Sequence, residues 1–304
     1  MIEGQEGVTW DDWVALAETC EKHGVEALFR SDHYLSGTDE SRPVLDAWAT
    51  IAGLAATTTL QLGTLVSPVT FRHPSVLARQ AATADEISGG RVTLGIGAGW
   101  MEREHEAYGF DFSTARNRVV RLAEQVEIVH GLLRNERVDF DGTFYELHDA
   151  PGLGRPSLPI LVGGSARPGT IAPAVRFADE YNTFFATFDE LRERKRALDG
   201  ACAAAGRDPA TLRYSLMAPC VVGDDDAAVR ASARRIGERF GCDEAQVLER
   251  YGERGPVGTV DQVVEHLRAI GALGYERVML QHLVHDDLET VALIGRELVP
   301  AVRS

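Results

Sequence analysis

The chain has 304 residues, of which 44% are hydrophobic and 25% charged, so it has enough apolar material for the core of a globular protein. Its formal net charge of −15 argues against nucleic acid and anionic membrane surfaces as partners, because both would repel it. The four cysteines lack the C-x-x-C spacing of zinc ribbons and redox motifs, no signal peptide is recognisable, and every apolar stretch is far shorter than the ~20 residues of a membrane span. We therefore expect a cytoplasmic protein.

Short apolar strands alternate with amphipathic helices along the chain. The first helix is expected between Thr9, an N-cap with Asp12 as its capping-box partner, and Gly24, which stops the helix. Further helices are expected at 43–57, 74–89, 114–134, 170–178, 188–205, 260–272 and 288–302. Strands are expected at 25–30, 60–66, 91–96, 159–162, 181–184, 212–222 and 275–281. This alternation predicts a parallel sheet, and the number of units favours a closed barrel.

Two segments interrupt the alternation. Residues 138–147 alternate in polarity around Asp141 and Gly142, which is a strong signal for a β-hairpin inserted at the barrel rim. Residues 224–254 are polar and irregular, and predict a helical insertion or lid. We expect one (β/α)8-barrel domain that spans residues 1–304 and carries these two rim insertions.

The first strand of this barrel is nearly absent. Seven strands are recognisable, and only Met1, Ile2 and Glu3 precede the first helix as the tail of an eighth. Either the barrel closes with this stub, or the true start lies upstream of Met1. In both cases the predicted fold class is an α/β TIM barrel whose first strand is truncated.

Active sites of such barrels lie at the carboxyl ends of the strands, and the loops there carry candidate residues. Asp32 and His33 follow the strand at 25–30, and a carboxylate beside an imidazole could exchange protons near neutral pH. A capping aspartate and a surface histidine are the alternative. In the next loop, small residues precede Pro68. Such a segment permits an unusual backbone conformation near a flat ligand. A plain turn that ends at the proline is the alternative.

Two of these loops are rich in glycine. Residues 97–99 allow the backbone to approach a ligand, but the G-x-G-x-G spacing lacks the acidic residue of a dinucleotide fingerprint, so we reject a Rossmann site. Residues 163–165 lead from a strand into a helix, where free amides and the helix dipole attract phosphate, with Arg167 beside them. A plain turn that requires glycine is the alternative for both loops.

Other polar clusters are assigned no catalytic role. One cluster lacks the H-E-x-x-H spacing and is expected on a solvated loop or helix face: Glu102, Glu104, His105 and Glu106. Another has the residue types of a metal site, but a capping or supporting role is favoured: His282, His285, Asp286 and Asp287. No G-x-S-x-G nucleophile motif occurs. No metal site is predicted, and a metal-dependent hydrolase is a poor alternative.

Taken together, the strand-end loops that carry candidate residues resemble those of the luciferase-like monooxygenase superfamily of flavin barrels, and in particular its coenzyme F420-dependent oxidoreductase branch. The resemblance rests on residues 30–33, 63–74, 82–91, 95–104 and 159–164, and spans the chain from about Thr9 to the last helix. It implies an oxidoreductase that transfers hydride between a reduced deazaflavin and a small carbonyl, imine or activated alkene. The implied cofactor is coenzyme F420, with FMN as the alternative.

The resemblance also implies roles for individual residues. Asp32 would contact the ring or a hydroxyl of the cofactor, and His33 would donate a proton to the substrate. A cis peptide bond is expected between Leu65 and Val66, behind the ring, and Trp100 would line the substrate pocket. The expected cofactor contacts are Asp32, Thr64, Leu65, Val66, Ser67, Gly97, Ala98, Gly99, Gly163, Gly164 and Ser165, of which the last three would hold the phosphate.

One position departs from the pattern of the branch. Trp100 stands where some F420-dependent dehydrogenases carry an acidic residue, which weakens the transfer of a sugar-phosphate substrate to this chain. An FMN-dependent monooxygenase and a flavin-binding barrel without turnover are the alternatives. Family analogy favours a homodimer, with a separate flavin or F420 reductase as a candidate partner. Substrate choice is expected to depend on the rim segments at 111–118 and 224–254.

Overall fold

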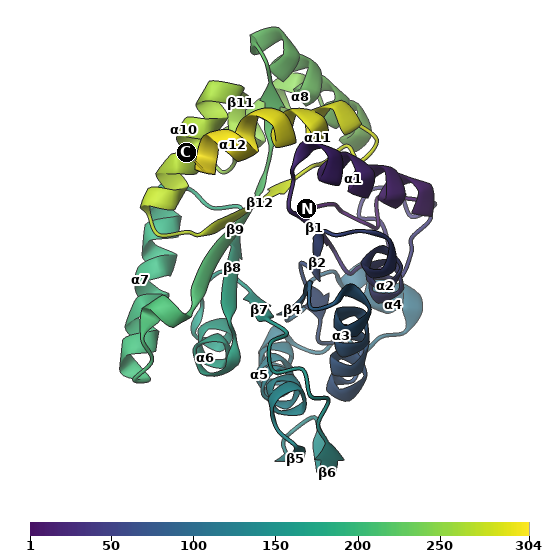
Figure 1. The fold of residues 1–304 in the computed structure, drawn as a ribbon, viewed down its shortest axis with the longest axis vertical. Helices are drawn as coiled ribbons and strands as arrows, with labels where there is room; N and C mark the ends of the chain where they lie inside the picture. The colour runs from purple at the N-terminus through teal and green to yellow at the C-terminus, as the bar shows by residue number, and fades with distance from the viewer. Residues whose placement is uncertain (304) are drawn as a thin grey trace.

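The computed structural model describes residues 1–303. Its centre is a parallel barrel sheet in which hydrogen-bonded neighbours follow the order β1-β2-β4-β7-β8-β9-β12, with β3 also paired to β4 (Figure 1). The barrel strands are β1 (Ala27–Arg30), β2 (Gln61–Thr64), β3 (Ser67–Pro68), β4 (Val92–Gly97), β7 (Ile160–Gly163), β8 (Glu180–Phe184), β9 (Arg213–Pro219) and β12 (Arg277–Gln281). The predicted TIM-barrel class is confirmed.

A two-residue stub closes the barrel between β12 and β1. The amide of Ile2 donates to the carbonyl of Phe29 at 2.9 Å, and the amide of Ser31 donates to the carbonyl of Ile2 at 3.1 Å. On the other side, the amide of His282 donates to the carbonyl of Met1 at 3.0 Å. The amino terminus therefore lies between the two strands (Figure 1), and the stub closes the barrel.

Helices surround this sheet, and their ends follow local capping signals. Thr9 and Asp12 form the predicted capping box, and Gly24 ends the first helix in the left-handed conformation with a φ of 81°. Thr187, Asp243 and Thr259 also begin helices with capping boxes. The helices are α1 (Trp10–His23), α2 (Ala47–Thr57), α3 (Pro74–Ser88), α4 (Glu102–Tyr108), α5 (Ala115–Arg134), α6 (Pro168–Phe177), α7 (Phe188–Ala204), α8 (Asp226–Phe240), α9 (Glu244–Gly252), α10 (Val260–Ala272), α11 (Leu288–Leu293) and α12 (Val299–Arg303).

The carboxyl-terminal helix was predicted as one uninterrupted segment but contains a π-helical stretch. Residues Ile294–Leu298 adopt this wider winding between α11 and α12. Gly295 lies in it directly against the carbonyl of His23 on α1, where a Cβ atom would collide with that oxygen. Within residues 1–303, none of the helices combines the length and the apolar character that a membrane crossing needs.

Both predicted insertions are present. The antiparallel hairpin consists of β5 (Arg137–Asp141) and β6 (Glu146–Pro151). Its turn is longer than the predicted Asp-Gly turn, because Asp141 pairs with Glu146 and four residues lie between them. The reason is a tertiary contact of the turn, because Glu124 on α5 accepts hydrogen bonds from the amides of Thr143 and Phe144 at 2.7 and 2.9 Å. The hairpin tip is therefore attached to α5.

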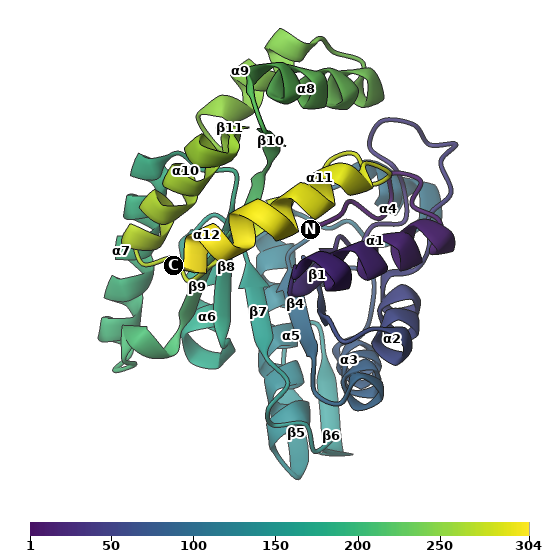
Figure 2. The same ribbon diagram turned by 45° about the horizontal axis from the view of Figure 1, so that its top comes forward.

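The helical insertion consists of α8 and α9, which extend beyond one end of the barrel in Figure 2. It is connected through a small parallel pair, β10 (Val221–Gly223) and β11 (Val257–Thr259). The strand predicted at 212–222 is consequently divided at Cys220, with β9 in the barrel and β10 in the insertion. Apolar residues of both parts form one buried cluster, which contains Val221, Val229, Ala233, Ile236, Val247, Leu283 and Val284.

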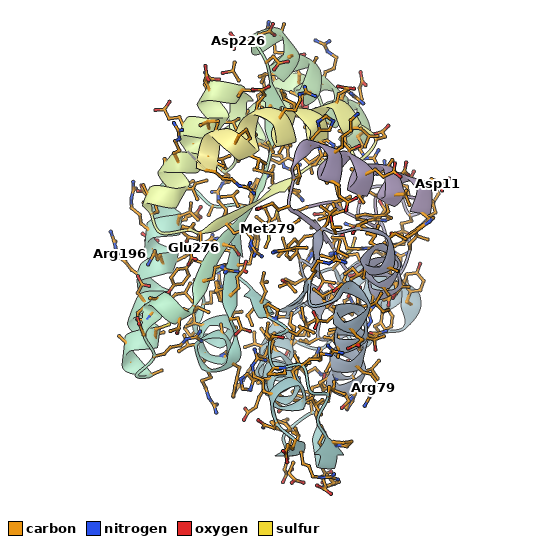
Figure 3. The ribbon with its side chains drawn as sticks, viewed as in Figure 1. Asp11, Arg79, Arg196, Asp226, Glu276 and Met279 are labelled. Atoms are coloured by element: carbon orange, nitrogen blue, oxygen red, sulfur yellow. The ribbon has the colours of Figure 1, made fainter. Side chains whose placement is uncertain are left out.

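The barrel interior has its own apolar cluster, separate from the larger core between sheet and helices. Phe29, Leu65, Leu161 and Met279 are its buried members, contributed by or adjoining four different barrel strands. Met279 is at the centre of the molecule in Figure 3, whereas labelled charged residues such as Arg79 and Asp226 lie toward its periphery. The lumen is therefore a packed core, as in other barrels of this class.

Near the carboxyl end of the barrel, Val66 packs between three glycines. The peptide bond between Leu65 and Val66 is cis, as expected. A Cβ atom on Gly97 would collide with the side chain of Val66, and one on Gly95 or Gly163 would lie 3.1 or 3.0 Å from it. The glycines at these positions of β4 and β7 thus make room for one valine from the segment between β2 and β3.

This packing leads to a prediction about stability. Gly97→Ala should destabilise the fold by about 1–3 kcal/mol, because the added methyl overpacks the space that Val66 fills. Adding Val66→Ala in the same chain should recover part of the loss, since it removes the opposing methyls. Thermal and urea unfolding monitored by circular dichroism measures both effects.

Gly200→Ala provides the control for this experiment. Gly200 lies in α7, and a Cβ atom there would meet nothing within 4 Å. That substitution should leave stability unchanged or raise it by up to about 1 kcal/mol, because alanine favours the helix. An alanine at position 97 that is equally harmless would contradict the proposed packing.

Candidate active site

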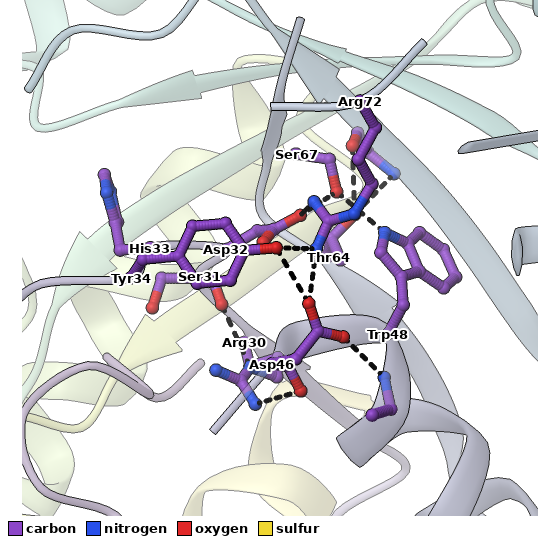
Figure 4. Close-up of polar contacts among 12 residues, drawn as sticks. Arg30, Ser31, Asp32, His33, Tyr34, Asp46, Trp48, Thr64, Ser67 and Arg72 are labelled. Atoms are coloured by element: carbon purple, nitrogen blue, oxygen red, sulfur yellow. Dashed lines mark hydrogen bonds and ion pairs between the residues drawn. The ribbon is translucent and has the colours of Figure 1, made fainter. Parts of the chain in front are cut away.

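Asp32 lies at the carboxyl end of β1 and is almost completely buried, with 1% of its surface exposed. One carboxylate oxygen, Oδ2, accepts hydrogen bonds from the hydroxyl of Ser67 and from Nη1 of Arg72, both at 2.6 Å. Trp48 supports this arrangement by donating from its indole to Ser67 at 3.0 Å (Figure 4). The other oxygen, Oδ1, has no hydrogen-bond partner within the described chain. A buried carboxylate oxygen without a protein partner can accept a hydrogen bond from a ligand or from water.

Arg72 links Asp32 to a second carboxylate. Its Nη2 donates to Asp46 at 2.7 Å and to the hydroxyl of Tyr34 at 2.8 Å. Tyr34 in turn donates to Asp46 at 2.9 Å (Figure 4). The guanidinium thus compensates two carboxylates at the base of the loop that follows β1.

His33, the next residue, is held by a buried glutamate. Its Nδ1 lies 2.8 Å from Oε1 of Glu104, which is completely buried, and the other glutamate oxygen accepts from the amide of Tyr34 at 3.1 Å. A carboxylate can only accept here, so Nδ1 carries the hydrogen and Nε2 is left for another partner. The edge of the His33 ring is also in contact with Trp100, with ring centroids 5.6 Å apart.

The pair of His33 and Glu104 raises the pKa of the imidazole. Burial alone would lower the pKa of His33, but the hydrogen bond and the charge of Glu104 raise it, and the charges of Glu3 and Asp32 add to that effect. The net result is a pKa above the ordinary value for histidine. The protonated ring is therefore favoured at higher pH than in a free imidazole, which suits a proton donor.

The prediction that Glu104 and His105 lie on a solvated face is wrong. Both residues are 0% exposed, whereas Glu102 and Glu106 on the same short helix are exposed as expected. His105 is held through Nδ1 by the carbonyl of Met101 at 2.7 Å and through Nε2 by the hydroxyl of Thr70 at 2.6 Å. Sequence reasoning missed them because the pattern of the four polar residues on α4 does not reveal which face of the helix is buried against the barrel.

The segment 64–67 was expected to contact a cofactor. Its four side chains have different environments from one another. Thr64 is buried and exchanges hydrogen bonds with the backbone of Gly95, at 2.9 and 3.2 Å. Leu65 belongs to the lumen cluster, and Ser67 is buried between Trp48 and Asp32. Val66 is half-buried. The side chains of Thr64 and Ser67 are therefore already engaged within the protein.

The glycines of the next loop have two different environments. Gly97 is buried against Val66, whereas Gly99 has a left-handed φ of 80°, which favours glycine there. A Cβ atom on Gly99 would lie 3.2 Å from the hydroxyl oxygen of Thr70. Ala98 between them is half-buried, and Trp100, which follows, is 70% exposed. The lack of a side chain at Gly97 is therefore required by the packing of Val66, whether or not a ligand also approaches this glycine.

The predicted phosphate loop leads from β7 into α6. The amide of Gly164 already donates to the carbonyl of Asn182 at 3.0 Å, and the amide of Ala166 donates to the hydroxyl of Tyr181 at 2.8 Å. Gly163, Gly164 and Ser165 are half-buried, and the first turn of α6 has no side-chain cap. Arg167 is exposed at this helix end. Pro168, the first residue of α6, has no N–H, and the amide of Thr170 donates to the carbonyl of Arg167 at 2.9 Å. Anion binding would thus fall to the amide of Gly169 and this guanidinium.

The cluster after β12 has structural partners. Asp287 caps α11 by accepting from the amide of Thr290 at 3.2 Å, as the favoured capping role predicts. His285 lies 2.9 Å from a guanidinium nitrogen of Arg239 and 3.6 Å from Asp12. Within residues 1–303 no group of three histidine, cysteine or acidic side chains is arranged to hold a metal ion.

The structure thus gathers most of the predicted site at one end of the barrel. Contacts join Asp32 to Ser67, and Val66 to both Gly97 and Gly163. His33 and Trp100 contact each other beside this group, while Gly164 and Ser165 continue toward α6. These residues fit a flat cofactor with an anionic tail, because a free buried acceptor and an uncapped helix start occur at the same end.

Comparisons with known proteins identify the family of the chain. The family profile of luciferase-like monooxygenases matches residues 2–257. The F420-dependent glucose-6-phosphate dehydrogenase of Microbacterium testaceum is 29% identical over 308 residues, covering 93% of this chain and 90% of that protein. The F420-dependent hydroxymycolic acid dehydrogenase of Mycobacterium tuberculosis is 32% identical over 232 residues, covering 73% of this chain and 62% of that protein.

Among solved structures, the monooxygenase RslO1 from Streptomyces bottropensis superposes with a TM-score of 0.81. It is 24% identical, and the match covers 96% of this chain and 93% of that one, which shows the shared fold. The predicted superfamily is confirmed, and both sequence relatives are F420-dependent oxidoreductases, as expected. The family profile alone covers most of the chain. This chain therefore belongs to the luciferase-like monooxygenase family.

Proposed function

We propose that the protein is a coenzyme F420-dependent oxidoreductase that acts on a small carbonyl, imine or activated alkene. The observation that carries the proposal is the pairing of His33 with the buried Glu104, beside Trp100 and next to Asp32. An imidazole whose pKa is raised, at one end of the barrel and with Nε2 available to act, is suited to proton donation. The names of the two sequence relatives support F420 as the cofactor.

The residues proposed to hold the cofactor are those around Val66. The free oxygen of Asp32 would accept a hydrogen bond from an N–H or hydroxyl of the ring system, and Leu65 and Val66 would form the wall behind it. Residues 97–99 would border the ring, and the start of α6 with Arg167 would hold the phosphate. A bound deazaflavin supplies hydride transfer and reacts poorly with oxygen.

The chain itself would orient the substrate and control the proton. His33 would give its Nε2 proton to a developing anionic atom of the substrate and take it back in the reverse reaction, while Glu104 keeps the imidazolium in place. Trp100 would form one wall of the substrate pocket. We further propose that the chain forms one domain, assembles as a homodimer in the cytoplasm, and receives reduced cofactor from a separate F420 reductase.

The first test is a fluorescence titration of the cofactor-free protein with F420 and FMN in parallel. Micromolar binding of F420, with at least about ten-fold weaker binding of FMN, is the expected result. Preference for FMN would replace the proposal by a monooxygenase that needs reduced flavin. Binding of neither would overturn the cofactor assignment.

A second test concerns the free oxygen of Asp32. Asp32→Asn should weaken F420 binding about ten-fold or more, because the charged acceptor is lost. Asp46→Asn is the matched control, since Asp46 shares Arg72 but offers no free buried oxygen at the site. It should weaken binding by less than about three-fold. Equal losses in both variants would show that the effect arises from disturbing Arg72 and would contradict a direct contact.

A third prediction concerns pH. The rate of carbonyl reduction should fall as pH rises through the pKa of His33, because the proton donor is lost. Glu104→Gln removes the charge that raises this pKa, so the alkaline limb of kcat/KM should move to lower pH and the rate at pH about 8 should drop several-fold. An NMR titration of the His33 ring should show the same displacement.

Glu106→Gln is the control, since Glu106 lies on the exposed face of the same helix. Its pH profile should match that of the unsubstituted protein. If Glu104→Gln lowers the rate equally at all pH values without moving the limb, Glu104 has only a structural role.

A further inference from the structure

The pair of His33 and Glu104 depends on the placement of a very short helix. α4 has seven residues, and its N-cap position makes no side-chain hydrogen bond. Helices of this length are not stable by themselves in water, so contacts with the rest of the protein must hold α4 in place. Within residues 102–108, Glu104 and His105 are buried and the other residues are exposed. These two side chains are therefore the buried anchors of the helix.

The two anchors reach different loops. Successive residues of an α-helix are rotated by about 100° around its axis, so adjacent side chains leave it in different directions. Glu104 reaches the loop after β1, where it contacts Nδ1 of His33 at 2.8 Å and the amide of Tyr34 at 3.1 Å. His105 reaches the loop after β3, where its Nε2 lies 2.6 Å from the hydroxyl oxygen of Thr70. One anchor alone would leave the helix free to turn about it, whereas two anchors fix its rotation.

The hydrogen bond between His105 and Thr70 has a defined direction. Nδ1 of His105 lies 2.7 Å from the carbonyl oxygen of Met101, which can only accept, so Nδ1 carries the hydrogen. In the neutral ring Nε2 is then an acceptor, and the hydroxyl of Thr70 donates to it. The imidazole also packs against Phe71 and Phe112, with ring centroids 5.1 and 4.6 Å apart. Loss of the hydroxyl would leave a buried acceptor unpaired, which favours displacement of the ring and of the helix that carries it.

The other contacts of α4 lie at the surface. Arg103 pairs with Glu40 at 2.7 Å, but both side chains are exposed, and exposed ion pairs contribute little to stability. The ring of Tyr108 contacts that of Tyr34 with centroids 6.2 Å apart, and Tyr108 is exposed as well. The orientation of the buried side of α4 therefore depends mainly on the hydrogen bond between His105 and Thr70.

Thr70 lies on the same loop as the partner of Asp32. Arg72, two residues further along, donates to Asp32 at 2.6 Å (Figure 4). Phe71 between them packs against the ring of Tyr34, with centroids 5.0 Å apart. The loop after β3 thus holds one anchor of α4 and the cation that compensates Asp32.

From these contacts we infer that His105 and Thr70 are positioning residues, which hold the carboxylate of Glu104 within hydrogen-bonding distance of the imidazole of His33. Neither residue has to touch cofactor or substrate for this role, because both act through Glu104. The consequence for catalysis rests on the proposed function, in which His33 donates a proton. The positioning itself concerns contacts within the protein and is testable without cofactor.

The charged groups that face His33 come from three elements. Burial lowers the pKa of this imidazole, whereas the carboxylates of Glu104, Glu3 and Asp32 raise it. Glu104 is on α4, Glu3 precedes α1, and Asp32 is on the loop of His33 itself. A displacement of α4 removes the contribution of Glu104 and leaves the other two in place, so the pKa of His33 should fall.

The test is an NMR titration of the His33 ring in variants of the full-length, cofactor-free protein. Thr70→Val keeps the shape of the side chain but removes the hydroxyl, whereas Thr70→Ser keeps the hydroxyl. Thr70→Val should move the titration midpoint to lower pH, by about half or more of the displacement that Glu104→Gln causes. Thr70→Ser should retain most of the original midpoint.

A double variant shows whether Thr70 acts through Glu104. Thr70→Val combined with Glu104→Gln should have the midpoint of Glu104→Gln alone, because the carboxylate that Thr70 positions is already absent. His105→Phe keeps an aromatic ring beside Phe71 but removes both hydrogen bonds, and it should match Thr70→Val. If Thr70→Val does not fold, as judged by circular dichroism, His105→Phe takes its place in the comparison.

Tyr275→Phe is the matched control. It also removes one buried hydrogen bond, which the hydroxyl of Tyr275 donates to the carbonyl of Leu191 on α7 at 3.0 Å. This bond joins the segment before β12 to α7 and has no part in holding α4. The midpoint of His33 should therefore stay unchanged in Tyr275→Phe.

The inference is overturned if folded Thr70→Val leaves the midpoint of His33 unmoved, or if Thr70→Ser moves it as far as Thr70→Val. It is also overturned if the double variant moves the midpoint beyond that of Glu104→Gln, or if Tyr275→Phe moves it equally. A failure of the proposed function is a different result, because it would appear as the absence of F420 binding, whereas this titration needs neither cofactor nor substrate.

Discussion

The packing of Val66 among Gly95, Gly97 and Gly163 is the constraint on which the carboxyl end of the barrel depends. Because β4 and β7 carry no side chains at these positions, the chain leaving β2 can place a valine between them. It then continues as β3, which pairs with β4. Ser67 is the first residue of β3, and it is thereby placed between Asp32 and Trp48. Van der Waals packing inside the barrel thus positions one partner of the buried carboxylate.

The charged groups of the site are held in two connected pairs rather than as one cluster. Asp32 is compensated by Arg72, and Glu104 by His33. Each carboxylate is buried, so removal of its partner would leave an uncompensated charge in a medium of low dielectric constant. Tyr34 lies between the pairs, because its hydroxyl contacts Arg72 and its amide donates to Glu104. His33 and Asp32 thus lie on one loop, but Glu104 on α4 holds His33, whereas Ser67 and Arg72 hold Asp32.

Local patterns predicted the elements better than the contacts between them. The helix at 260–272 has the bounds that were predicted, because its cap and periodicity lie within its own sequence. The hairpin was predicted correctly, but its turn depends on Glu124 from α5, which no local pattern contains. Glu104 and His105 were missed for the same reason: their partners, His33 and Thr70, lie 71 and 35 residues away in sequence. Only the folded barrel brings them together.

The separation between Trp100 and Glu104 would allow this barrel to keep the proposed chemistry while its substrate changes. Glu104 lies on the buried face of α4, where it holds the imidazole, whereas Trp100 precedes the helix and is exposed. Replacement of residue 100 would therefore alter the wall of the pocket without removing the partner of His33. In the proposed function, the carboxylate on the helix would control the proton, and the residue before the helix would control which substrates approach it. Two neighbouring positions on one loop and helix can thus evolve under different constraints.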